Sequence, residues 1–67
     1  MTEKTLKKLS EELPQAKTFL DNRKKVLHNT NKKDDVRGEI RGYLAAFRTM
    51  GAITDVEMRL LLTYYTM

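Results

Sequence analysis

Residues 35–50 read DVRGEIRGYLAAFRTM, and placed on a helix their side chains separate into three faces. At about 100° per residue, the bulky apolar residues share one sector of roughly 120°, which predicts a face buried in a core. These residues are Val36, Ile40, Tyr43, Leu44, Phe47 and Met50. The stretch is therefore predicted to be the central helix of a small helical domain, with Asp34 or Asp35 as its N-cap.

The opposite face of this helix carries almost no side chain. Its members are Gly38, Gly42, Ala45, Ala46 and Thr49. A glycine inside a helix costs roughly 1 kcal/mol relative to alanine. This stripe of small residues therefore predicts that another helix crosses close to it. A narrow edge of Arg37, Arg41 and Arg48 separates the two faces.

Before the central helix, apolar residues keep a spacing of three and four. They are Leu6, Leu9, Leu13, Ala16, Leu20 and Leu27. This phase predicts one helix over about residues 3–28, but Pro14 within it removes a backbone hydrogen bond and clashes with the preceding turn. Ser10, followed by two glutamates, has the form of an N-cap. We expect a firm helix over about residues 10–28, a kinked or frayed turn over residues 1–9, and a loop over residues 29–34.

The central helix is predicted to end at Gly51, which can adopt the left-handed conformation of a C-terminal cap. Residues 54–57 then read TDVE, the pattern of a capping box between Thr54 and Glu57. The last helix is predicted from Asp55 to about Thr66. Its apolar residues point almost all the way round, which predicts burial on every side.

These elements predict an all-α protein, a small three-helix bundle with a kinked N-terminal helix, a central helix and a short C-terminal helix. The 67 residues form one domain, residues 1–67, and so short a chain gains only marginal stability from its core. There is no cysteine to form a disulfide. We therefore expect self-association or a partner to add stability. No apolar run has the length of a signal peptide or membrane span, so we expect a cytoplasmic protein without membrane contact.

The excess positive charge lies entirely in residues 1–41 and is densest in residues 22–33, NRKKVLHNTNKK. Such a patch is suited to phosphate or to an acidic protein surface, although solvated lysines that serve solubility give the same pattern. The candidate contacts are Arg23, Lys24, Lys25, Lys32, Lys33, Arg37, Arg41 and Arg48. Nucleic acid bound by these residues would be held through phosphates, without sequence preference.

The sequence contains no pattern that indicates catalysis. A glycine-rich phosphate loop is absent, and Asp34 and Asp35 are explained by helix capping. The single histidine, His28, is expected at a helix C-terminus or on the surface. We therefore predict a non-enzymatic protein without cofactor, metal or small-molecule substrate.

Residues 44–62, LAAFRTMGAITDVEMRLLL, resemble the helical hairpin of SHOCT-type domains. The matching residues are Gly51, Ile53, Thr54, Glu57 and Leu61. The stretch is also similar to the ends of small uncharacterised proteins carried by phages and conjugative elements of Gram-positive bacteria. The resemblance implies an oligomerisation or adaptor role, and it suggests a mobile genetic element as the source.

The leading hypothesis is a protein–protein interaction module that forms a homodimer or binds another protein. A last helix that is apolar all round, together with the bare face of the central helix, suggests the interface. Its candidate residues are Gly38, Gly42, Ala45, Met58, Leu60, Tyr64 and Met67. The alternatives are a basic accessory factor that binds nucleic acid non-specifically, and a small inhibitor that covers an acidic or nucleic-acid-binding site on another protein.

Overall fold

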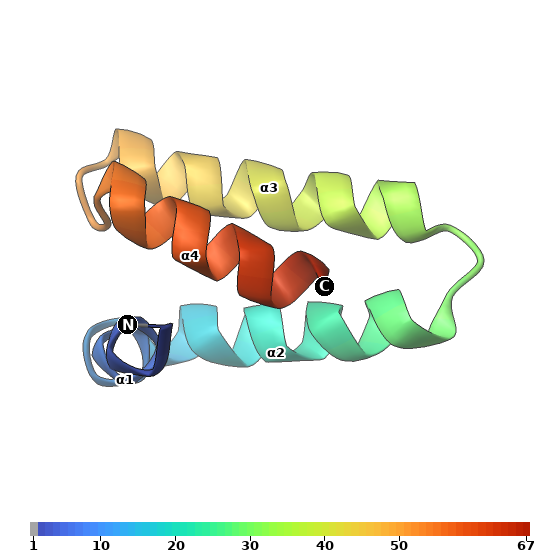
Figure 1. The fold of residues 1–67 in the computed structure, drawn as a ribbon, viewed down its shortest axis with the longest axis horizontal. Coiled ribbons are helices and arrows are strands. Elements are labelled where there is room, and N and C mark those ends of the chain that lie inside the picture. Colours follow the sequence, from blue (N-terminus) through green and yellow to red (C-terminus); the bar gives the residue numbers. More distant parts are fainter. Residues whose placement is uncertain (1) are drawn as a thin grey trace.

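The structure is a computed structural model that describes residues 2–67, and over that range it contains four α-helices. They are α1 (Thr2–Glu12), α2 (Pro14–Asn29), α3 (Lys33–Thr49) and α4 (Asp55–Thr66). Figure 1 shows α2 and α3 as an antiparallel hairpin, α4 lying against it, and α1 seen almost end-on beside the start of α2. The all-α class is confirmed, and the predicted number of three helices is wrong.

The extra helix arises because the expected N-terminal helix is divided at Leu13. Leu13 has φ −136° and ψ 63°, outside the helical region, and it is the N-cap of α2 without a side-chain hydrogen bond. Pro14 occupies the first turn of α2, where its missing N–H is not needed and its fixed φ suits a helix. The predicted N-cap at Ser10 is wrong, because Ser10 lies inside α1. Residues 2–9, expected to fray, are also helical, and Met1 lies outside the described residues.

The connection between α2 and α3 is shorter than expected. α3 begins at Lys33 after the N-cap Lys32, so Asp34 and Asp35 lie in its first turn and neither is the N-cap. Their charges still favour that end of the helix, because the unpaired N–H groups there are partially positive. The Lys33 ammonium donates to the carbonyl of Leu27 over 2.7 Å, which ties the start of α3 to the end of α2.

The corner between α3 and α4 has the predicted geometry. Gly51 has φ +79°, and the backbone N–H groups of Gly51 and Ala52 donate to the carbonyls of Arg48 and Phe47. These two bonds form a Schellman motif. The capping box is also present: the Thr54 hydroxyl accepts from the Glu57 N–H over 3.1 Å, and Glu57 Oε1 accepts from the Thr54 N–H over 2.9 Å.

A single core lies between the four helices. Its buried hydrophobic residues are Leu9, Ala16, Leu20, Leu27, Val36, Ile40, Leu44, Ile53, Leu61 and Tyr65. Five of the six residues predicted for the apolar face of α3 contribute to this core. Val36, Ile40 and Leu44 are buried, and Tyr43 and Phe47 are half-buried against them. Met50 does not contribute, since it is the C-cap residue of α3 and remains 68% exposed.

Within residues 2–67, no helix crosses the small-residue stripe: Gly38 and Gly42 are exposed, and a methyl group added at either would meet nothing within 4 Å. The predicted crossing therefore stays a prediction about a helix of another molecule. The last helix is also not buried on every side. α4 packs against α1, α2 and α3, but Val56 and Met67 remain 58% and 68% exposed. Three neighbouring helices leave one side of α4 open.

Candidate interaction surface

The open side of α4 is lined by residues spaced four, three and four apart. We call Val56, Leu60, Thr63 and Met67 the α4 seam. On a helical wheel they fall within about 60°, and this spacing is that of a helix which packs along another helix. Val56, Thr63 and Met67 are exposed and Leu60 is half-buried. The phase of the seam is set by the capping box at Thr54, which fixes where α4 begins.

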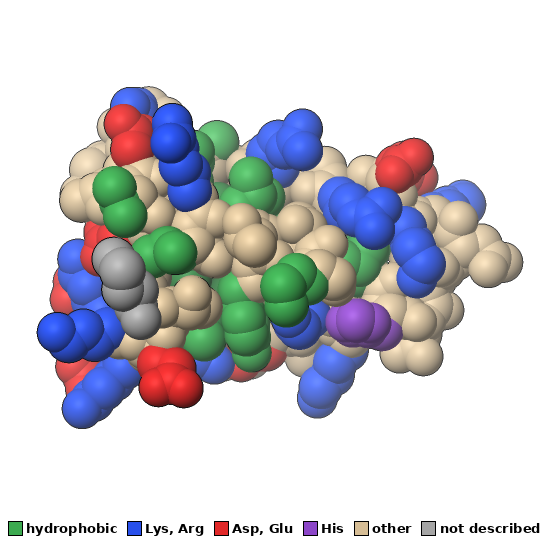
Figure 2. Space-filling model, in the orientation of Figure 1, with side chains coloured by type: hydrophobic (Ala, Val, Ile, Leu, Met, Phe, Trp, Pro, Cys, Tyr) green, Lys and Arg blue, Asp and Glu red, His purple; other side chains and the backbone are tan. Residues whose placement is uncertain are grey.

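A groove between α1 and α4 follows this seam. The part beside the start of α4 is lined by Lys4, Thr5, Lys8, Val56, Glu57 and Leu60. The part beside the end of α4 is lined by Thr2, Glu3, Leu6, Leu60, Thr63, Tyr64 and Met67. Leu60 lines both parts, which lie next to each other along α4. Figure 2 shows hydrophobic side chains gathered over this face, with Lys and Arg side chains around them.

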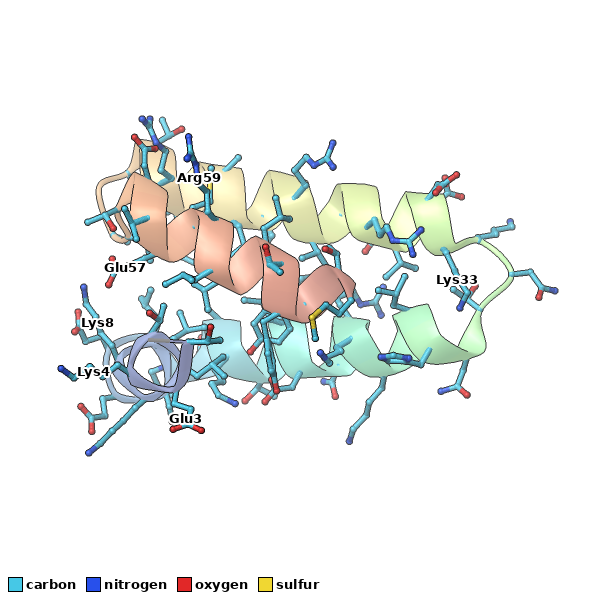
Figure 3. The ribbon with its side chains drawn as sticks, viewed as in Figure 1. Glu3, Lys4, Lys8, Lys33, Glu57 and Arg59 are labelled. Carbon is cyan, nitrogen blue, oxygen red and sulfur yellow. The ribbon has the colours of Figure 1, made fainter. Side chains whose placement is uncertain are left out.

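An ion pair joins α1 to α4 at the groove. Lys8 Nζ lies 2.7 Å from Glu57 Oε2, and Figure 3 shows the two side chains pointing toward one another from α1 and α4. Hydrogen bonds from Lys8 and from the backbone of Thr54 lower the pKa of the Glu57 carboxyl below its ordinary value. Arg59 lies on the other flank of α4, so the groove has charged residues on both rims.

Polar contacts hold the C-terminal half of α4 on α2. Asp21 accepts from the Tyr65 hydroxyl over 2.8 Å and from Lys17 over 2.8 Å. Burial, and then the hydrogen bond to Asp21, raise the pKa of the Tyr65 phenol above its ordinary range. Lys24 donates to the Tyr64 carbonyl over 2.5 Å and lies 3.9 Å from the centre of the Tyr64 ring. These contacts keep the α4 seam in one orientation.

The residues predicted for the interface do not lie on one surface. Gly38, Gly42 and Ala45 are exposed on the side of α3 opposite its core face, away from the groove. Leu60, Tyr64 and Met67 line the groove. Met58 packs against the core. The groove also includes Val56 and Thr63. In the sequence, Val56 was one of many apolar residues around the last helix, and Thr63 carried no apolar signal.

The basic residues predicted to contact phosphate are mostly engaged within the chain. Arg23 pairs with Glu39 at 3.1 Å and Arg37 with Asp34 at 3.4 Å. Arg48 forms an ion pair with Asp55, in which its Nη2 lies 3.0 Å from Oδ2, and this pair lowers the pKa of the Asp55 carboxyl. Lys24 and Lys33 donate to backbone carbonyls, as described above.

The remaining basic candidates are scattered. Lys25 is exposed on α2, Lys32 precedes α3, and Arg41 is exposed on α3. The candidates thus lie on α2, on α3 and in the connection between them, and five of the eight have a partner within the chain. This arrangement is compatible with the alternative stated from the sequence, that the basic residues are solvated and serve solubility.

A second exposed apolar feature lies on the α2–α3 hairpin. The rings of Phe19 and Tyr43 lie 4.3 Å apart, and those of Tyr43 and Phe47 lie 4.9 Å apart at 89°. The guanidinium of Arg23 lies 5.8 Å from the centre of the Phe19 ring. Phe19 is 37% exposed, so this row of rings is more deeply set into the surface than the ends of the α4 seam.

Residues 2–67 contain no group of three or more His, Cys, Asp or Glu side chains placed to hold a metal ion. In the same part of the chain, no helix is both long enough and apolar enough to cross a membrane.

The fold and the groove together define a small all-α domain with one exposed seam on its last helix. A scan against protein-family models and searches of curated proteins and of solved structures each found no match for this chain.

Proposed function

We propose that this chain is a non-enzymatic protein–protein interaction module whose docking surface is the α1–α4 groove. The observation that carries the proposal is the exposure of Val56 and Met67 at the two ends of the α4 seam. The core is filled by other residues, so folding does not require these side chains to be apolar. Exposed apolar residues that line neighbouring hollows along one helix face are typical of a binding surface.

The energetics favour a protein partner. Burying one apolar side chain of this size is worth about 1.5–3 kcal/mol, and the partly exposed residues of the groove would gain a fraction of that value each. Tyr64 and Met67 belong to residue types that are enriched in interfaces. The resemblance to SHOCT-type hairpins implies an oligomerisation or adaptor role, which is also a role in protein–protein interaction.

Nucleic-acid binding receives less support. Binding to phosphate requires free cations gathered on one face, whereas Arg23, Arg37 and Arg48 each face a carboxylate. A role as an inhibitor would use the groove in the same way, with another protein as the target.

The proposal can be tested by site-specific photo-crosslinking. The chain has no cysteine, so Thr63→Cys introduces a unique attachment point for a benzophenone in the groove. Thr49→Cys gives the matched control, because it also replaces an exposed threonine, on the outer side of α3. Both proteins are irradiated in a nuclease-treated lysate of the source organism.

We expect discrete protein adducts, with the chain itself or with another protein, from position 63 and not from position 49. Excess unlabelled wild-type chain should compete with them, and excess Leu60→Lys chain should not. Equal labelling from both positions, or no adduct from position 63, would refute the proposal.

A further inference from the structure

α1 supplies little of the buried core. Among residues 2–67, ten hydrophobic residues are buried, and Leu9 is the one that belongs to α1. The other nine belong to α2, α3, α4 and the corner before α4, so most of the core lies between those helices. Besides Leu9, α1 contributes the buried Thr5 and the partly buried Leu6.

Polar contacts join α2, α3 and α4 without involving α1. Tyr65 ties α4 to α2 through Asp21, and Lys33 ties the start of α3 to the end of α2. The Lys8–Glu57 ion pair joins α1 to α4, and its lysine side chain is 44% exposed. An ion pair at such an exposed position contributes little to stability, because water screens the two charges.

The composition of α1 does not favour a helix that stands alone. Its last turn contains Glu11 and Glu12 and no basic residue, so negative charges lie at the helix end whose free carbonyl groups are already partially negative. Pro14 follows, and it has no N–H to donate to the carbonyl of Ser10. α1 has 11 residues, and isolated helices shorter than about 12–15 residues are marginal in water. A detached α1 therefore loses its helix, so that its residues open together.

Leu13 forms the boundary of this unit. It leaves the helical region at φ −136° and ψ 63°, between the last residue of α1 and Pro14. Figure 1 shows the chain changing direction there, since α1 is seen almost end-on and α2 lengthwise. We infer that α1 is a hinged arm, which opens at Leu13 as one unit while α2, α3 and α4 stay folded.

Opening of the arm changes the surface of α4. Ile53 and Leu61 line a hollow beneath α1 and are buried while the arm is closed. Opening uncovers this side of both residues and removes the α1 wall of the groove. The arm therefore controls whether the groove exists, whatever the groove binds.

Hydrogen exchange of the full chain under native conditions, followed by NMR, tests the opening residue by residue. The amides of residues 6–12 donate within α1 and should share one protection factor, at least about tenfold below the highest values in α2, α3 and α4. Protection in α1 equal to that of the other helices would overturn the inference. Protection that declines gradually toward residue 2 would overturn it too, because it indicates fraying rather than a hinge at Leu13.

A substitution remote from α1 separates local opening from global unfolding. Tyr65→Phe removes a bond between α2 and α4, which breaks when the whole chain unfolds and stays intact when α1 opens. We expect protection in α2, α3 and α4 to fall about fivefold, the usual net value of one hydrogen bond, and protection in α1 to remain unchanged. Ile40→Val, in the core on α3, repeats the test with a packing change. A parallel fall in α1 would show that it opens only with the whole chain.

A pair of alanine substitutions within α1 provides the matched control. Leu6→Ala removes apolar contact that the opening breaks, so protection in α1 should fall about fivefold. Lys7→Ala, at the neighbouring exposed position, should leave it unchanged. Equal protection in the two variants would show that these amides exchange without α1 leaving its neighbours, and would overturn the hinged arm.

Discussion

The hydroxyl of Tyr65 donates a hydrogen bond to Asp21 Oδ1 over 2.8 Å and so joins the last turns of α4 to the middle of α2. The Tyr65 ring is completely buried, and Asp21 is also held by Lys17. A phenol at this position therefore packs as a core residue and forms a polar tether at the same time.

Replacing Tyr65 by phenylalanine should retain the ring and remove the tether. We expect Tyr65→Phe to lower the free energy of unfolding by about 1 kcal/mol, the usual net value of one hydrogen bond. Urea denaturation followed by circular dichroism measures this change. Tyr43→Phe, on the half-buried aromatic row, is the control and should change stability less. An unchanged midpoint for Tyr65→Phe would show that the bond contributes nothing to stability.

The raised pKa of Tyr65 predicts how the stability of the fold changes at alkaline pH. Its pKa is raised in the folded chain, so the unfolded chain loses this proton first as pH rises above the ordinary value of 10.0. The folded state then binds more protons than the unfolded state, and stability falls with rising pH. Tyr65→Phe should show a shallower decline above about pH 10 than wild type. Parallel slopes for the two proteins would contradict the raised pKa.

Alanine substitutions at two glycines should have opposite effects. Gly51→Ala places a side chain at φ +79° and should cost about 1–2 kcal/mol, although nothing crowds the position. Gly42→Ala lies in the interior of α3 with nothing within 4 Å and should stabilise by roughly 1 kcal/mol. Thermal melts of both variants provide the comparison. A destabilised Gly42→Ala chain would mean that the outer side of α3 is not open.

The ion pair between Lys8 and Glu57 should determine part of the loss of stability at acid pH. The pKa of Glu57 is lowered in the folded chain, so its contribution is present above the ordinary value of 4.5 and is lost as pH falls through the folded pKa. Lys8→Met removes the largest cause and should flatten the loss of stability in that range. Lys7→Met, one residue away and exposed, is the control. Identical acid profiles for Lys8→Met and wild type would contradict the pairing.

The α3–α4 corner could be predicted from sequence because its determinants are local. Gly51, Thr54 and Glu57 act within a few residues of one another, and their roles do not depend on the rest of the fold. The division at Leu13 could not be predicted in the same way. Leu9, Leu13 and Ala16 keep a helical spacing on both sides of the break, and periodicity does not record a change in the direction of the helix axis.

The open side of α4 was predicted only in part for a related reason. Leu60, Tyr64 and Met67 were identified because the last helix has more apolar residues than one neighbour can cover. Which of its sides stays open depends on where α1 lies, and the break at Leu13 determines the position of α1. No helix within residues 2–67 covers Gly38 and Gly42, so the small-residue stripe stays a prediction about contact with another molecule.

The central place of α4 affects how the chain acquires its structure during synthesis. α4 contacts each of the other helices, whereas α1 contacts α2 and α4. A ribosome makes α1, α2 and α3 before α4, so the core that includes Leu20, Ile40 and Leu44 cannot be completed until α4 has been made. Chains that expose such residues are substrates for chaperones and proteases. A chain cut short within α4 would therefore expose part of this core and become such a substrate.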